Sequence, residues 1–481
     1  MASNSYTQAD DREQIALVDD VFQLQKAAFK LQPYLDAASR IHDLQLLKKA
    51  LLDHQQSLVE ALSEDFGCRS LDDSKMADLM PTVMGINYAL KRVKKWMKPS
   101  KRHVGPLFQP AKGYVMYQPL GVVGIITPWN YPLFLSLGPL TTALAAGNRA
   151  LIKMSEFTPK TNEVLAKMLG GIFSHDKVAV ITGGPDVAAH FSRQPFDHLL
   201  FTGSTRVGKM VMAAASENLT PVTLELGGKS PSIIDDSIDM KDAVSRLILG
   251  KTLNAGQTCV APDYILCPHG RIEEFKQACA DWFSKMYPDI ANNKDYTGII
   301  NDAQFERLSA WLADAGEKGA ELTELGDDSK GACREQRKLP LTLVTGVSDD
   351  MTLMQEEIFG PLLPVVGYGS LDEAIEYVND RPRPLALYLC SFDEKIQQKV
   401  LEQTHAGGVC LNDSAMQVAQ DDMPFGGIGP SGMGHYHGHE GFLTLSKAKS
   451  VLKKGKHNTS SLAFPPYGKL VHKLIYKLFL R

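Results

Sequence analysis

A single cysteine, Cys259, stands in a small polar turn within the stretch NAGQTCVAPDYIL, residues 254–266. Structural cysteines usually lie among apolar neighbours, where the thiol is inert. Here Gly256, Gln257 and Thr258 come directly before the cysteine, so the backbone can turn sharply and leave the sulfur at a surface. The pattern indicates a reactive thiol, the kind of nucleophile that attacks a carbonyl carbon.

That chemistry needs a donor for the developing oxyanion, a base for the second half-reaction and an acceptor for what leaves. Asn130 in TPWNYP offers a side-chain amide that could donate to the oxyanion beside the backbone N–H of Cys259. Glu225 in LELGGKSP offers a carboxylate where a strand should end, and partial burial there would raise its pKa toward neutrality. No histidine stands in the pattern of a cysteine hydrolase, although distance along the chain does not exclude one.

Two further stretches could bind a nucleotide as the acceptor. In FTGSTRVGK, Gly203 ends an expected strand, Ser204 begins a helix and Gly208 lets that helix pack closely. A helix N-terminus with hydroxyl groups can bind phosphate, although the stretch lacks the G-x-G-x-x-G fingerprint. In LIKMSE, Lys153 and Glu156 lie at the end of another strand, where a ribose would bind at the carboxyl edge of a sheet. A carboxylate there would repel a 2′-phosphate, which favours NAD over NADP.

These residues follow strand-like runs in a chain that alternates strands with helices. The runs GVVGIIT, RALIKMS, KVAVITG, DHLLFTG and PVTLEL alternate with helix-like segments such as TPKTNEVLAKMLGGIF. A second series begins near SIIDDS and includes YILCPHG, PLLPVVGY and LALYLC. Such alternation predicts an α/β protein with two parallel-sheet domains that meet close to Gly227. Residues 15–66 have helical spacing, and the polar stretch 314–338 is expected to be an exposed excursion.

The composition excludes several classes of protein. A chain of 481 residues exceeds the size of a single core, and a net charge of −4 creates no field that attracts nucleic acid. Seven cysteines are scattered without a C-x-x-C pair, which argues against a disulfide framework or a thiolate zinc site and for a reducing compartment. The polar N-terminal residues and the lack of a long apolar run predict no secretory signal and no membrane span, hence a cytoplasmic protein.

Six stretches occur in the order and with the spacing of one family: TPWNYP, FTGSTRVG, LELGGKSP, NAGQTCVAPDYIL, EEIFGP and PFGGIGPSGMG. In these motifs the chain resembles the aldehyde dehydrogenase superfamily, from about residue 15 to about residue 455. VAPDYILC, PLALYLC and SGMGHYHGHEGFLTLSKAKSV resemble its class 3 branch, and within it the bacterial coniferyl-aldehyde dehydrogenases.

The resemblance implies a role for each matching residue. Cys259 matches the nucleophile that forms a thiohemiacetal, Asn130 the oxyanion donor, and Glu225 the base that activates water against the resulting thioester. The positions that would bind NAD, with NADP as a possible alternative, are Lys153, Glu156, Gly203, Ser204, Gly208, Trp129, Leu226, Glu357 and Phe359. Asn412 in CLNDS matches the loop on the substrate side, and the family needs no metal.

The same resemblance implies oxidation of an aromatic, or of a medium- to long-chain aliphatic, aldehyde to the carboxylic acid. It implies a Rossmann-like NAD-binding domain of residues 1–101 and 120–226 and a catalytic domain of residues 227–440. Residues 102–119 and 441–457 would form a β arm that joins two subunits in a homodimer. The competing hypothesis is a cysteine acyltransferase or esterase without redox chemistry. An idle homologue and CoA-dependent acylation are less favoured, because the base and the other reactive groups are present.

The motif HYHGH raises the alternative of a metal site. His435, His437 and His439 alternate, so a strand would place them on one side, as metal ligands can be. A glycine-flanked turn with structural histidines is favoured instead, and we expect no metal.

The tail, residues 458–481, ends in GKLVHKLIYKLFLR, in which Lys469, Lys473 and Lys477 recur every four residues. This pattern predicts a short basic amphipathic helix that is too short and too charged to span a bilayer. Docking against protein, on the partner subunit or over the substrate entrance, is favoured over peripheral contact with an anionic membrane.

Overall fold

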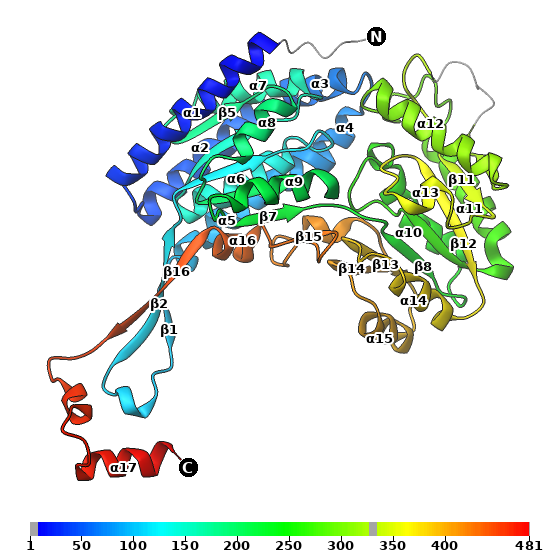
Figure 1. Cartoon of the computed structure of the whole chain (residues 1–481). Coiled ribbons are helices and arrows are strands. Elements are labelled where there is room, and N and C mark those ends of the chain that lie inside the picture. The colour runs from blue at the N-terminus through cyan, green and yellow to red at the C-terminus, as the bar shows by residue number, and fades with distance from the viewer. Residues whose placement is uncertain (1–7, 327–333, 481) are drawn as a thin grey trace.

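The computed structural model describes residues 8–326 and 334–480, and its body is built on two mainly parallel sheets (Figure 1). The first sheet has the strand order β15-β7-β6-β3-β4-β5, in which β15 is antiparallel to β7 and the other pairs are parallel. Its strands are β3 (Val122–Ile126), β4 (Arg149–Lys153), β5 (Val178–Ile181), β6 (His198–Thr202), β7 (Val222–Glu225) and β15 (Gly432–Met433).

Helices cover both faces of this first sheet, as the alternating side chains of β3 show. Val122 and Ile126 pack in one apolar cluster, whereas Val123 and Ile125 pack in another. The first face is covered by α1 (Gln8–Leu31), α8 (Pro185–Ser192) and α9 (Thr205–Ser216). The second is covered by α2 (Ala37–Asp53), α3 (Gln55–Asp65), α5 (Met80–Trp96), α6 (Phe134–Ala146) and α7 (Pro159–Gly170). A short helix, α4 (Leu71–Ser74), and a π-helical turn (Lys75–Leu79) lead into α5.

The second sheet has the order β10-β11-β12-β9-β8-β13-β14, and only β10 of its described strands is antiparallel to its neighbour. Its strands are β8 (Pro231–Ile234), β9 (Tyr264–Pro268), β10 (Glu321–Glu324), β11 (Thr342–Thr345), β12 (Leu362–Tyr368), β13 (Ala386–Cys390) and β14 (Gly408–Leu411). The helices of this half are α10 (Met240–Thr252), α11 (Ile272–Met286), α12 (Asp302–Glu317), α13 (Thr352–Gln355), α14 (Leu371–Asn379) and α15 (Glu394–Gln403).

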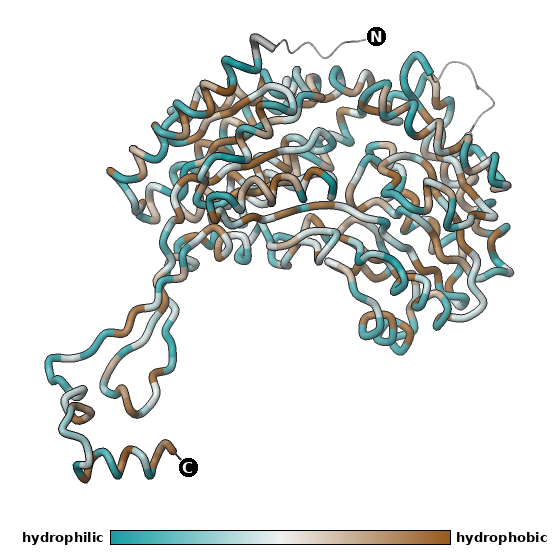
Figure 2. Tube along the Cα trace, in the orientation of Figure 1, coloured by the Kyte–Doolittle hydropathy of each residue, from teal (hydrophilic) through white to brown (hydrophobic). Residues whose placement is uncertain are grey.

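A three-stranded arm projects from the body (Figure 1). It consists of β1 (Ser100–Arg102), β2 (Lys112–Pro119) and β16 (Ser446–Lys453), with β2 in the centre. β2 and β16 pair antiparallel along their whole length, although more than 300 residues of chain separate them. Beyond the arm lie a 3₁₀ turn (Thr459–Ala463) and α17 (Leu470–Phe479), which carry both hydrophobic and hydrophilic residues far from the body of the same chain (Figures 1 and 2).

The structure confirms the expected α/β class with two parallel-sheet units. The polar stretch 314–338 differs from the expectation, because it contains the end of α12 and the edge strand β10; its residues 327–333 lie outside the described part. Two expected ranges also differ. β15 lies in the first sheet rather than with the rest of residues 227–440, and α16 (Gly438–Thr444) packs on α5 and α6 before the arm begins at Ser446. Within the described residues, no helix has the length and apolarity to cross a membrane.

Candidate active site

The expected nucleophile follows a strained turn at the junction of the two sheets. After α10, Asn254 and Ala255 both have φ of 51°, a left-handed conformation that is uncommon outside glycine. Gly256 has φ of 73°, and a Cβ at this position would lie 2.4 Å from the carbonyl oxygen of Gly360. Only glycine therefore fits there, and the chain reaches Cys259 with its thiol half-buried.

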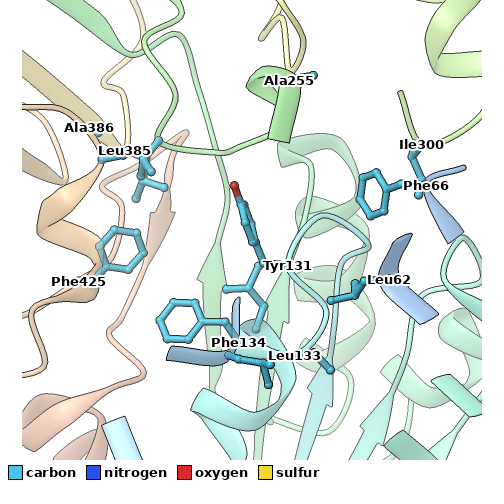
Figure 3. Close-up of a cluster of buried hydrophobic side chains, with 14 of the residues drawn as sticks. Leu62, Phe66, Tyr131, Leu133, Phe134, Ala255, Ile300, Leu385, Ala386 and Phe425 are labelled. Carbon is cyan, nitrogen blue, oxygen red and sulfur yellow. The ribbon is translucent and has the colours of Figure 1, made fainter. Parts of the chain in front are cut away.

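Gln257 fixes this turn through three hydrogen bonds to the backbone. Its Nε2 donates to the carbonyls of Asn254 (2.9 Å) and Gly298 (3.1 Å), and its Oε1 accepts from the N–H of Ile300 (3.0 Å). Thr258 adds a fourth contact, since its hydroxyl lies 2.8 Å from the hydroxyl of Tyr131. The Tyr131 ring stands in the apolar cluster with its hydroxyl toward the chain that leads to Ala255 (Figure 3). The nucleophile is thus carried on a turn held from several sides.

Asn130, the expected oxyanion donor, is buried and joined to the same turn. Its Nδ2 donates to the carbonyl of Gln257 at 3.1 Å. Its own carbonyl accepts from Nη1 of Arg69 (2.8 Å) and from Nδ2 of Asn254 (3.2 Å). Because an amide nitrogen carries two hydrogens, the second hydrogen of Nδ2 can serve an oxygen of a bound substrate. Arg69 was not found by sequence reasoning.

Glu225, the expected base, ends β7 and is 2% exposed. Neither of its carboxylate oxygens has a hydrogen-bond partner among the described residues. Burial raises its pKa well above the usual value, because the charged form loses its hydration without gaining a partner. A carboxyl group in this environment can take up a proton at neutral pH, which is the property that a general base needs.

The thiol of Cys259 has an unusually high pKa in the protein alone. Burial raises it to about 12, and the negative charges of Glu357 and Glu225 act in the same direction. The cysteine is therefore protonated near neutral pH, and its attack on a carbonyl requires transfer of the proton to a base. The charge of Glu225 acts on this pKa, so the two side chains are electrostatic neighbours.

Glu357 lies against the start of the second unit. Its carboxylate fills the space over Gly227, where a Cβ would lie 2.1 Å from Oε1. Burial, together with the charge of Asp263, raises the pKa of Glu357 to about 8, whereas the N–H of Gly228 and the cations Lys229 and Arg307 oppose the rise. A half-buried carboxylate that is only partly compensated can accept hydrogen bonds from ligand hydroxyl groups.

Two aromatic residues named from the sequence meet beside this carboxylate. Phe359 has φ of 49°, and its ring makes an edge contact with Trp129, with centroids 5.2 Å apart. The ring of Phe66 also contacts Trp129, with centroids 6.2 Å apart. The three rings form one apolar cluster, and Phe359 follows Glu357 by two residues, a combination that suits a flat ligand ring with an attached sugar.

The remaining expected cofactor positions lie at the carboxyl ends of parallel strands in the first sheet. Lys153 ends β4 and is buried, with Nζ donating to the carbonyl of Met154 at 2.7 Å. Desolvation lowers its pKa to about 8, while the charge of Glu156 raises it in part. Gly203 follows β6, and Ser204 caps α9 by accepting from the N–H of Val207.

Leu226 lies at the close approach of α9 to the end of β7. A Cβ at Gly208 would lie 2.7 Å from Cδ2 of Leu226, so the helix N-terminus approaches the sheet only because this residue is glycine. A helix N-terminus and a lysine at the carboxyl ends of parallel strands are the arrangement expected of a dinucleotide site.

Asn412, His437 and His439, which the sequence analysis also named, contact other residues of the fold. Asn412 has φ of 58°, and its Oδ1 accepts from the N–H of Ser391 at 2.9 Å. His437 stacks on Tyr436 and His439 stacks on Trp96. Within the described residues, no group of three or more histidine, cysteine, aspartate or glutamate side chains converges as metal ligands would.

A comparison with known families places this geometry in context. The model of the aldehyde dehydrogenase family matches residues 6–451. The chain belongs to the aldehyde dehydrogenase family. This match confirms the resemblance to the aldehyde dehydrogenase superfamily that six sequence motifs indicated. It also confirms the prediction that the chain is an enzyme.

The enzyme is 57% identical, over 100% of both chains, to a probable coniferyl aldehyde dehydrogenase of Pseudomonas aeruginosa. Among solved structures it resembles a substrate-bound AldH of Staphylococcus aureus, with a TM-score of 0.91, 38% identity and coverage of 96% of this chain and 99% of that one. It also resembles an aldehyde dehydrogenase of Mycobacterium tuberculosis in complex with NAD⁺, with a TM-score of 0.83, 29% identity and 92% of each chain covered.

A substitution of Glu357 tests the electrostatic environment of Cys259. At about pH 9 the Glu357 carboxylate, with its pKa of about 8, is charged and disfavours the thiolate. Glu357→Gln should lower the Cys259 pKa and speed its alkylation by iodoacetamide roughly three- to tenfold, because the thiolate is the reacting form. Mass spectrometry of the Cys259 peptide follows the rate. Glu356→Gln, at an exposed neighbour, is the matched control, and equal rates in wild type and Glu357→Gln would contradict this account.

Lys153 should lower the free energy of unfolding when no ligand is bound. Its folded pKa of about 8 lies below the unfolded value of 10.5, so only the unfolded chain binds the proton between these values and stability rises with pH across that window. At neutral pH the penalty is about 3 kcal/mol. Lys153→Met should therefore raise the melting temperature at pH 7 and flatten the rise between about pH 8 and 10. Lys160→Met, at an exposed lysine, should change neither quantity in thermal denaturation.

Proposed function

We propose that this enzyme oxidises an aromatic aldehyde such as coniferyl aldehyde, or a medium- to long-chain aliphatic aldehyde, to the carboxylic acid with NAD. The observation that carries the proposal is the convergence of Cys259, Asn130 and the unpartnered carboxyl group of Glu225 at one edge of the first sheet. The aromatic substrate is supported by the 57% identity to a probable coniferyl aldehyde dehydrogenase over the whole chain.

In the first half-reaction, Sγ of Cys259 forms a bond to the aldehyde carbon. The thiol proton passes to a base, for which Glu225 is placed. The developing negative charge on the aldehyde oxygen is stabilised by Nδ2 of Asn130 and by the backbone N–H of Cys259. The product of this step is a thiohemiacetal on Cys259.

Oxidation of the thiohemiacetal removes a hydride from its carbon, and a bound nicotinamide cofactor supplies the acceptor for that hydride. Lys153 and Glu156 at the end of β4 suit the hydroxyl groups of an adenosine ribose, and the carboxylate disfavours a 2′-phosphate. This arrangement supports NAD over NADP. The aldehyde dehydrogenase of Mycobacterium tuberculosis in complex with NAD⁺ supports the same choice.

In the second half-reaction, water hydrolyses the thioester on Cys259. Glu225 first releases to solvent the proton that it took from the thiol. It then takes a proton from the water, the water oxygen bonds to the carbonyl carbon, and the carbon–sulfur bond breaks as the departing sulfur takes up that proton from Glu225. The carboxylic acid leaves and the thiol is regenerated. The raised pKa of Glu225 makes this proton uptake favourable near neutral pH.

A cysteine acyltransferase or esterase is the alternative that uses the same thiol without redox chemistry. It gives no role to Glu357, to the ring contact of Phe359 and Trp129, or to the glycines beside α9. These features support a bound nicotinamide nucleotide, and the alternative is therefore disfavoured.

Purified enzyme with NAD should form NADH from coniferyl, benzyl-type or long-chain aliphatic aldehydes. Cys259→Ala should abolish the reaction, with a loss of at least about a thousandfold, because the covalent route is removed. Cys68→Ala, at another half-buried cysteine, is the matched control and should retain activity. Cys259-dependent ester cleavage without NADH or NADPH formation would instead establish the esterase alternative.

We further propose a cytoplasmic homodimer joined through the arm. β1 and β16 are the outer strands of the three-stranded sheet, and such edges pair readily with another chain. The described cysteines are all free, which is consistent with a reducing compartment.

The tail is proposed to dock on the second copy of the chain. Nine of the 51 basic residues and none of the 55 acidic residues lie in residues 441–481, so the rest of the chain has a net charge of −13. Leu470, Leu474 and Leu478 are more than half exposed on α17 and form a row beside the row of its lysines. An acidic partner surface complements this basic and apolar helix.

Removal of residues 468–481 should weaken the dimer in analytical ultracentrifugation, and added salt should weaken the full-length dimer in the same direction. Replacement of Lys469, Lys473 and Lys477 by glutamine keeps the apolar side and should reproduce the salt effect. Sedimentation with anionic phosphatidylglycerol vesicles tests the membrane alternative, and tail-dependent binding there with an unchanged dimer would refute docking. If the dimer, vesicle binding and substrate preference all stay unchanged, the tail has none of these roles.

A further inference from the structure

Tyr436 is a buried phenol that the two half-reactions leave without a role. It lies in the short loop between β15 and α16 and is 1% exposed. Its hydroxyl has no hydrogen-bond partner among the described residues. A buried hydroxyl of this kind destabilises the fold unless a water or a ligand completes its hydrogen bonds. The group therefore requires an explanation.

The ring of Tyr436 is fixed from several sides, so the hydroxyl cannot turn toward solvent. Phe134 and Phe425 make edge contacts with the ring at centroid distances of 6.5 and 6.3 Å. His437 stacks on it at 5.1 Å. On α6, a Cβ at Gly138 would lie 3.3 Å from Cε2 of the tyrosine. The position of the phenolic oxygen is thus set by packing.

The backbone brings this hydroxyl to the base. β15 pairs antiparallel with β7, with Gly432 opposite Glu225, and the N–H of Leu226 donates to the carbonyl of Ser431 at 3.2 Å. Tyr436 follows four residues after Gly432. Its pKa is raised well above the usual value, first by burial and then by the charges of Glu225 and Cys259, so the phenol is neutral and is an electrostatic neighbour of both groups.

Three buried oxygens thus have no hydrogen-bond partner among the described residues: both carboxyl oxygens of Glu225 and the hydroxyl of Tyr436. They belong to β7 and to the loop that directly follows its partner strand β15. Neither residue hydrogen-bonds the other directly, and one molecule placed between them could complete the hydrogen bonds of both. Water is the smallest molecule that can make two such hydrogen bonds. The hydrolysis of a thioester at Cys259 needs a water in this neighbourhood.

We propose that Tyr436 is a positioning residue for the water that hydrolyses the thioester, an inference that rests on the proposed function. One O–H of the water donates to Glu225 and the other donates to the phenolic oxygen of Tyr436, so that a lone pair of the water faces the thioester carbonyl carbon. When the carbon–oxygen bond forms, the first proton passes to Glu225 and the sulfur of Cys259 leaves. Tyr436 neither gains nor loses a proton.

Tyr436→Phe removes the hydroxyl and keeps the ring contacts, so it isolates this role. With NAD and aldehyde in stopped flow, the fast phase of NADH formation should keep its rate. The steady-state rate should fall about tenfold, since the loss of one hydrogen bond in a transition state is worth on the order of a factor of ten. An acyl adduct on Cys259 should accumulate in mass spectra of the quenched enzyme. The melting temperature should not fall, because the variant removes a hydroxyl without a protein partner.

Tyr368→Phe is the matched control, because it removes another buried hydroxyl, which donates to the carbonyl of Ile234 at 2.6 Å in the second unit. This variant should lose stability and keep both kinetic phases. A steady-state rate and adduct level in Tyr436→Phe equal to those of wild type would overturn the positioning role. An equal slowing of both phases would also overturn it, as it would indicate a structural effect. Wild-type enzyme that forms no NADH would instead refute the proposed function itself.

Discussion

The burial of Glu225 without a hydrogen-bond partner is the constraint on which the arrangement of the site depends. A buried carboxylate that lacks a partner is unstable, and the carboxyl group responds by a raised pKa. The fold holds it in place from both sides of β7, where Thr202 of β6 and Gly432 of β15 are its neighbours in the sheet. This pairing keeps the side chain from relaxing toward solvent. The raised pKa that results suits the proposed role of Glu225 as a proton acceptor.

The turn that carries Cys259, the proposed nucleophile, is also held in an unfavourable conformation. Asn254 and Ala255 occupy the left-handed region, and strain of this kind persists only where surrounding contacts enforce it. Gln257 supplies those contacts through bonds to Gly298 and Ile300, which belong to a loop of the second unit. Cys259 is thus positioned by the second unit, whereas Asn130 and Glu225 are positioned by the first. The proposed reaction requires the two units to be held in a fixed position relative to each other. The hydrogen bond from Nδ2 of Asn130 to the carbonyl of Gln257 joins them directly.

The sequence predicted the parts of this molecule that are encoded locally. Apolar runs that end in glycine or polar residues located β4, β6 and β7, and the residues that follow them were named because parallel strands share a carboxyl edge. Arg69, Gln257 and Tyr436 were missed, since their contacts join segments of chain that are far apart. β10 was missed for a related reason, because a polar edge strand with little burial has no alternation of apolar residues to mark it. The two-residue strand β15 is too short for any periodicity.

The cofactor edge shows how ligand binding and folding are coupled in this enzyme. Lys153 and Glu357 are both desolvated, and their pKa values are displaced toward each other, to about 8 for each, from opposite directions. In the protein alone, each charged form is therefore disfavoured, and the edge is less stable than an apolar one of the same shape would be. A ligand that brings hydroxyl groups to both side chains restores hydrogen bonds that folding removed. Its binding then stabilises the folded state by mass action as well as through its own contacts. The same desolvated charges that lower the stability of the free protein would favour a polar, sugar-bearing ligand at this edge under the proposed function.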